Sequence, residues 1–76
     1  MANALSFTII LEPQPEGGFT VRVPALPEVV TEGDTEAEAM EMAEDAVRLA
    51  LEHRKEHGIP ISPDLPPTLR QISIAA

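Results

Sequence analysis

The sequence predicts a small α+β fold, β-β-β-α-β, in which a small antiparallel sheet carries one long helix packed on one face. Two stretches near the start alternate apolar and polar residues, which is the two-residue period of strands. A later stretch repeats apolar residues at spacings of three and four, which is the period of a helix. With 76 residues and no cysteine, we expect a single domain over residues 1–76 with no disulfide to stabilise it.

The first predicted strand covers residues 5–12, whose alternate apolar positions are Leu5, Phe7, Ile9 and Leu11. Two prolines and a Gly-Gly pair make residues 13–18 a hairpin loop, because proline cannot donate to a ladder and glycine lets the chain reverse. Apolar and polar residues alternate again over 19–23, which predicts the second strand. The β-branched run at 29–31 predicts a short third strand, and Gly33 allows the sharp turn that follows.

We predict the long helix over residues 35–57. A capping box opens it, in which the Thr35 hydroxyl accepts from the N–H of Glu38 and the Glu38 carboxylate reaches back to the N–H of Thr35. Gly58 is typical of the residue just after a helix end. The apolar stripe that faces the sheet consists of Ala39, Met40, Ala43, Ala46, Val47, Ala50 and Leu51.

A thin core and one uncovered face of the predicted sheet indicate that the chain associates with itself. Prolines dominate residues 59–68, which favours extended, polyproline-like backbone, and residues 69–74 predict one last strand. Because one helix covers one face only and the core is thin, we expect a homo-oligomer, a dimer or tetramer, formed through an edge strand or the second face. That second face carries Thr8, Ile10, Thr20 and Arg22. Met42 and Leu49, at one margin of the helical stripe, either pack in the core or meet a second subunit.

The net charge of −8 at pH 7 comes from one stretch of the chain. Residues 28–45 contain no Lys or Arg and eight acids: Glu28, Glu32, Asp34, Glu36, Glu38, Glu41, Glu44 and Asp45. The rest of the chain is neutral. This balance disfavours direct binding to nucleic-acid phosphates, which Lys and Arg recognise. The acidic stretch either steers a basic partner or is a solvated helix face that keeps a small protein soluble.

The sequence offers little chemistry for catalysis. His53 and His57 lie one helical turn apart, but no third ligand accompanies them, and histidines at a helix C-terminus commonly complement the dipole; we expect no metal and no cofactor. Glu38, Glu41 and Asp45 recur at helical spacings without a pocket that would perturb their pKa values. No nucleophile is paired with a base, so we expect no enzyme activity. Because nothing resembles a signal peptide or a membrane span, we expect a cytoplasmic protein.

An ordered set of motifs resembles the N-terminal module of HicB-type antitoxins. The motifs are Gly17-Gly18-Phe19-Thr20-Val21-Arg22-Val23-Pro24, then Leu26-Pro27, then Thr31-Glu32-Gly33-Asp34-Thr35 with Glu38-Ala39, and later Gly58-Ile59-Pro60 and Ser62-Pro63. The resemblance covers about residues 5–64. The chain differs from the family's Pro-Asp-Leu-Pro-Gly turn, because Ala25 and Glu28 replace the acid and the glycine.

The resemblance implies a degraded RNase H-like fold without its catalytic residues, and an antitoxin that sequesters a HicA-type toxin. Such a toxin is a small basic ribonuclease with a double-stranded-RNA-binding fold and a catalytic histidine, and the antitoxin would cover the surface that receives RNA. We expect this toxin to contact part of the acidic stretch, namely Glu36, Glu41, Glu44 and Asp45.

Three further expectations concern DNA binding and the alternative functions. Many members continue into a ribbon-helix-helix or helix-turn-helix domain that binds operator DNA; this sequence reaches Ala76 without one, so we expect no direct DNA binding. The alternative function is an orphan oligomeric module of the same fold, with no toxin partner, that contributes an interaction or regulatory surface. A residual metal-dependent nuclease is a more distant alternative.

Overall fold

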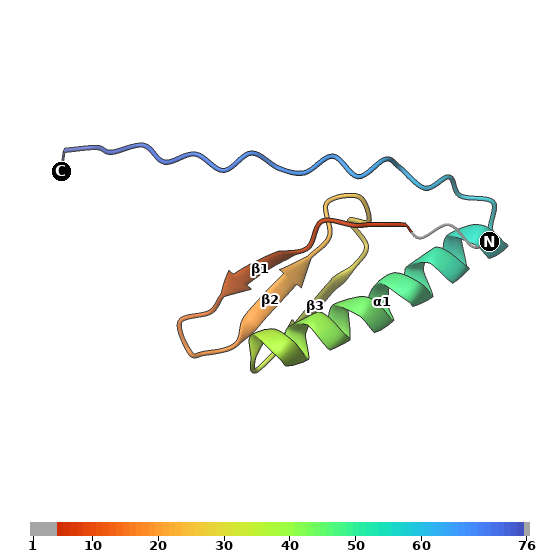
Figure 1. Ribbon diagram of the computed structural model, residues 1–76, viewed down its shortest axis with the longest axis horizontal. Coiled ribbons are helices and arrows are strands. Elements are labelled where there is room, and N and C mark those ends of the chain that lie inside the picture. Colours follow the sequence, from red (N-terminus) through yellow and green to blue (C-terminus); the bar gives the residue numbers. More distant parts are fainter. Residues whose placement is uncertain (1–4, 76) are drawn as a thin grey trace.

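A computed structural model describes residues 5–75, which form three antiparallel strands followed by one long helix (Figure 1). The strands are β1, Ile10–Pro13, β2, Phe19–Arg22, and β3, Val30–Gly33, and the helix is α1, Glu36–Glu56. This arrangement confirms the predicted small α+β fold with one helix on one face of the sheet.

The sheet is a simple meander in the order β1-β2-β3. Val21 at the centre of β2 lies opposite Leu11 of β1 and Thr31 of β3, so these side chains share the face toward the helix. The predicted hairpin is confirmed with different bounds: β1 begins at Ile10 rather than residue 5, and Pro13 still pairs with Phe19, so the loop covers 14–18. Gly17 and Gly18 in this loop have φ of 100° and 80°, a region that favours glycine. Alternation then places Ile10, Thr20 and Arg22 on the opposite face, as predicted.

Helix α1 begins at the predicted cap. The Thr35 hydroxyl accepts a hydrogen bond from the Glu38 N–H at 3.1 Å. The return bond differs from the prediction, because the Glu38 carboxylate accepts from the N–H of Asp34, at 3.3 Å, rather than from that of Thr35. Asp34 lies one residue further out in the turn, where its N–H is not used by a strand. The helix ends at Glu56, and Gly58 follows with φ of 65°.

Small residues let α1 approach the sheet closely over β2 and β3. Ala39 and Ala43 are buried against Val21. Gly33 is required at the end of β3, because a Cβ there would lie only 2.4 Å from the backbone nitrogen of Ala39. A second buried cluster, beneath the C-terminal half of α1, contains Val23, Leu26 and Val29.

The predicted strand over residues 69–74 does not form. From residue 59 to residue 75 the described backbone is extended without a ladder, and Figure 1 shows this tail running past the sheet. The radius of gyration is 14.9 Å, against about 11 Å for a compact chain of this length. Prolines explain the course of the tail, since they fix φ, cannot donate hydrogen bonds and disfavour reversal of the chain.

Candidate protein-binding surface

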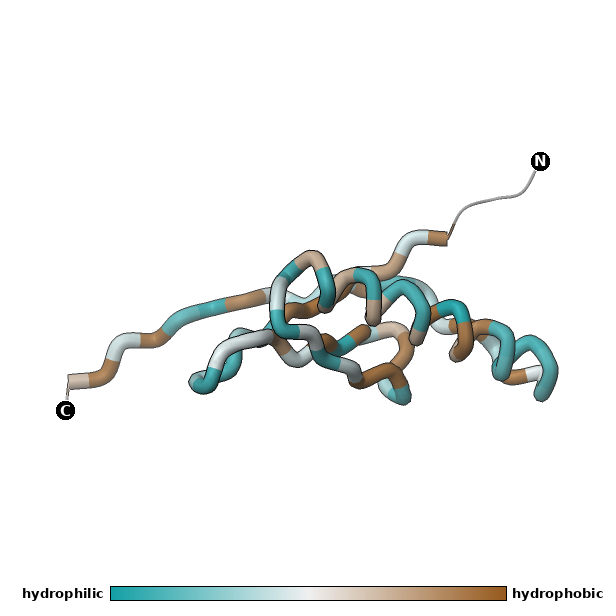
Figure 2. The backbone as a smooth tube through the Cα atoms, turned by 90° about the horizontal axis from the view of Figure 1, so that it is seen from below, coloured by the Kyte–Doolittle hydropathy of each residue, from teal (hydrophilic) through white to brown (hydrophobic). Residues whose placement is uncertain are grey.

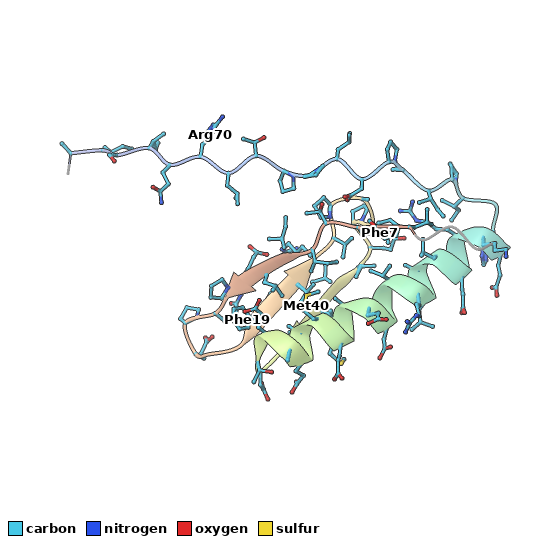
Figure 3. The ribbon with its side chains drawn as sticks, in the orientation of Figure 1. Phe7, Phe19, Met40 and Arg70 are labelled. Carbon is cyan, nitrogen blue, oxygen red and sulfur yellow. The ribbon has the colours of Figure 1, made fainter. Side chains whose placement is uncertain are left out.

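An apolar groove lies between α1 and the segment that leads into β1. It exists because the helix packs over β2 and β3, which leaves the inner side of β1 and its preceding residues partly uncovered. The groove has a volume of about 560 Å³. Its apolar walls come from Leu5, Phe7 and Ile9 on one side and Met40, Val47 and Leu51 on the other. Figure 3 labels Phe7 and Met40, one from each wall.

Acidic side chains rim this groove on the helix side. Glu41 and Glu44 line it, as does Arg48, which forms an ion pair with Glu44 and lies 3.9 Å from a carboxylate oxygen of Asp45. The structure therefore brings together two of the four predicted toxin-contacting residues, Glu41 and Glu44, at the groove. Asp45 does not line the groove itself but lies beside Arg48, which does. Glu36 is exposed in the first turn of α1 and does not line the groove.

One acid of the acidic stretch has a different role. Both carboxylate oxygens of Glu28 accept from the Arg54 guanidinium, each at 2.7 Å. The same guanidinium donates to the carbonyl of Pro60 at 3.0 Å, so the loop before β3, the end of α1 and the start of the tail meet here. The hydrogen bonds from Arg54 lower the pKa of Glu28 to about 2 and raise the pKa of Arg54 in turn.

Sequence reasoning missed both the Glu28–Arg54 pair and the groove. Glu28 and Arg54 are 26 residues apart, so no local spacing connects them. The groove depends on the sideways placement of the helix over the sheet, which helical periodicity does not determine. One signal was available: Met40 and Leu51 lie at one edge of the apolar stripe, where incomplete covering is common.

The uncovered face of the sheet holds three of the four residues predicted for self-association, Ile10, Thr20 and Arg22, and Thr8 lies in the segment just before β1. Thr8 is already bound, because its N–H and hydroxyl donate to the two carboxylate oxygens of Asp64 at 2.9 and 2.8 Å. Arg22 pairs with Glu12 at 2.6 Å. Ile10 and Arg22 line a shallow hollow that Pro67 of the tail also lines.

The histidine pair and the remaining carboxylates form no enclosed site. The rings of His53 and His57 stack with centroids 4.2 Å apart, and Nδ1 of His57 lies 2.9 Å from the carbonyl oxygen of His53. Within residues 5–75, no three His, Cys, Asp or Glu side chains are grouped to hold a metal ion. Glu38, Glu41 and Asp45 are all exposed. The described part of the chain also contains no helix long and apolar enough to cross a bilayer.

Comparison with known proteins identifies relatives over part of the chain, although no family model matches it. It is 48% identical over 48 residues to Antitoxin HicB 1 of Photorhabdus laumondii and 44% identical over 48 residues to Antitoxin HicB of Escherichia coli K12. Each match covers 63% of this chain but only 31% and 35% of those proteins, so the chain spans about a third of their length. It is also 35% identical over 60 residues to a UPF0150 protein of Thermoplasma acidophilum, across 79% of this chain and 87% of that protein.

Proposed function

Because the chain belongs to the HicB-like antitoxin family, we propose that it is an antitoxin-like module that sequesters a small basic HicA-type ribonuclease toxin. It does so by covering the RNA-binding surface of the toxin. It acts in the cytoplasm by binding, without catalysis and without a cofactor. The observation that carries this proposal is the apolar groove with its acidic rim.

The two parts of the groove serve different steps of binding. The apolar walls, including Phe7 and Met40, offer the buried contact that holds a complex together. The rim acids Glu41 and Glu44 are exposed and face a partner before contact, so their field accelerates the approach of a basic protein. A toxin that binds RNA must be basic at its RNA-binding surface, and that same surface complements this rim.

A second function is favoured by the relative that matches over most of its length. The Thermoplasma protein is named only by the designation UPF0150, and its similarity extends beyond the length shared with the HicB antitoxins. On this alternative, the chain is an orphan oligomeric module that offers an interaction or regulatory surface and has no toxin partner. Affinity capture with the tagged chain from its native host distinguishes the two, since the first function requires a small basic ribonuclease among the captured proteins.

The role of the rim is tested by association kinetics with a purified HicA-type toxin. We expect Glu41→Gln/Glu44→Gln to reduce the association rate constant about 5-fold at low salt and to flatten its dependence on ionic strength. The matched control is Glu52→Gln/Glu56→Gln, which removes the same charge from exposed positions of α1 outside the groove. Equal rate changes in both variants would show that net charge alone, not the rim, attracts the toxin.

A further inference from the structure

The tail carries large apolar side chains that nothing in residues 5–75 covers. Leu65, Leu69, Ile72 and Ile74 are 73%, 86%, 83% and 78% exposed. Figure 2 shows the brown, hydrophobic positions of this segment lying well away from the rest of the backbone. An isolated exposed leucine is ordinary, but four such residues within ten positions of one extended segment are typical of a surface that another chain covers.

The outer part of the tail has the sequence of a strand. Thr68 to Ile74 contains no proline, and alternation places Ile72 and Ile74 on one face with Arg70, and Gln71 and Ser73 on the other with Leu69. Its backbone is already extended. A strand of this kind lacks only a neighbour whose N–H and C=O groups are free.

The sheet offers such a neighbour at β1. Among residues 5–75 this strand pairs with β2 on one side only, so no described strand occupies its outer edge. The same edge borders the groove, where Phe7 and Ile9 remain partly uncovered. The chain therefore presents both an unpaired strand and an unpaired edge.

Only the first part of the tail lies beside its own sheet, and the outer part does not follow the outer edge of β1 in the same chain. The two hydrogen bonds from Thr8 to Asp64 fix the tail beside the segment that leads into β1, and Pro67 lines the same hollow as Ile10 and Arg22 of the sheet. Beyond Pro66-Pro67, which favour continued extension, Figures 1 and 2 both show the tail running past the end of the sheet. A second copy placed beside β1 would meet this projecting segment.

We propose that residues 65–75 are an exchanged arm. In a two-fold symmetric dimer, residues 69–74 of each copy pair with the outer edge of β1 in the other copy and complete its sheet with a fourth strand. Arg70, Ile72 and Ile74 face the side of the groove, and Leu69, Gln71 and Ser73 lie on the outer face of the completed sheet. In a reciprocal exchange, the backbone hydrogen-bonding groups of the arm and of the β1 edge are paired in both copies. Such identical contacts on both sides are what an isologous dimer requires. This arrangement does not depend on the identity of any toxin.

Sedimentation analysis of matched arm variants tests the exchange. Ile72→Lys/Ile74→Lys and Gln71→Lys/Ser73→Lys add the same charge to opposite faces of one segment. We expect a wild-type dimer at micromolar concentration, a dimer dissociation constant raised at least about 100-fold in the first variant, and a change below about 3-fold in the second. Because all four side chains are exposed in the single chain, circular dichroism should show the helix of α1 retained in both.

NMR on the wild-type protein tests whether the arm contacts β1 of the other copy rather than β1 of its own chain. A mixed dimer of methyl-labelled and unlabelled copies should give intermolecular contacts between the Ile72 and Ile74 methyl groups and the protons of β1. A wild-type monomer, a dimer equally tight in both lysine variants, or contacts to β1 only within one chain would each overturn the proposal.

Discussion

At the scale of single residues, the clearest electrostatic feature is the bidentate pair of Glu28 and Arg54. The Arg54 side chain is 11% exposed and that of Glu28 is 43% exposed, so solvent screens the pair on one side. Its position is nonetheless structural, because Arg54 also holds the carbonyl of Pro60. The pair therefore ties a loop, the helix end and the root of the tail together.

We predict that Glu28→Gln lowers the free energy of unfolding by about 1 kcal/mol at pH 7, after allowance for screening. The pKa of Glu28 is about 2 in the folded chain, against an ordinary value of 4.5. Stabilisation by a lowered pKa is fully present above pH 4.5 and is lost as the pH falls toward 2. Urea unfolding of both proteins at pH 7 and pH 2.5 measures this difference, which should fall to about a quarter of its pH 7 value at the lower pH. Glu16→Gln, in the exposed hairpin loop, is the control and should show no difference at either pH.

Gly33 provides a steric test of the close approach between α1 and β3. We predict that Gly33→Ala destabilises the fold by about 2–3 kcal/mol, because the new methyl would overlap the backbone of Ala39 and displace the helix. Gly17→Ala should cost about 1 kcal/mol, because only its positive φ is unfavourable and its surroundings are open. Thermal unfolding measures both. A Gly33→Ala protein as stable as the wild type would contradict the packing described for the helix.

At the scale of elements, the sequence was most informative where structure is local. The Pro/Gly loop, the alternation over residues 19–22 and the Thr35 cap each depend on residues within a few positions, and the hairpin and helix formed as predicted. Residues 69–74 had the right alternation for a strand, yet a strand also needs an edge, and local pattern does not say whether the same chain supplies it. The groove was missed because the sideways position of α1 depends on Gly33 and the small residues opposite it.

The N-terminal cap of α1 can be tested by single substitutions at Thr35. We predict that Thr35→Ala lowers stability by about 1 kcal/mol, because it removes the acceptor for the Glu38 N–H, whereas Thr35→Asp retains an acceptor and most of that stability. Hydrogen exchange at the first turn of α1 should accelerate in the alanine variant alone. Equal exchange in both variants would mean that tertiary packing, not the cap, holds this turn.

At the scale of the whole molecule, charge, groove and tail divide the surface into regions with different roles. The acidic stretch extends from the loop before β3 along the first half of α1, and Glu41 and Glu44 of this stretch line the apolar groove. The tail offers apolar surface with two charges, those of Asp64, which accepts from Thr8, and Arg70. We assign the groove to a basic partner and the tail to a second copy of the chain.

The central claim is that the groove binds a HicA-type toxin, and α1 provides a matched pair of variants to test it. Met40 and Met42 are each 44% exposed, but Met40 lines the groove and Met42 does not. The decisive measurement is a titration of the ribonuclease activity of a purified toxin with wild type, Met40→Lys and Met42→Lys. We predict stoichiometric loss of RNA cleavage with the wild type, inhibition weakened at least about 10-fold by Met40→Lys, and inhibition close to wild type with Met42→Lys. Undiminished cleavage with the wild-type chain, or equal weakening by the two lysines, would contradict this account.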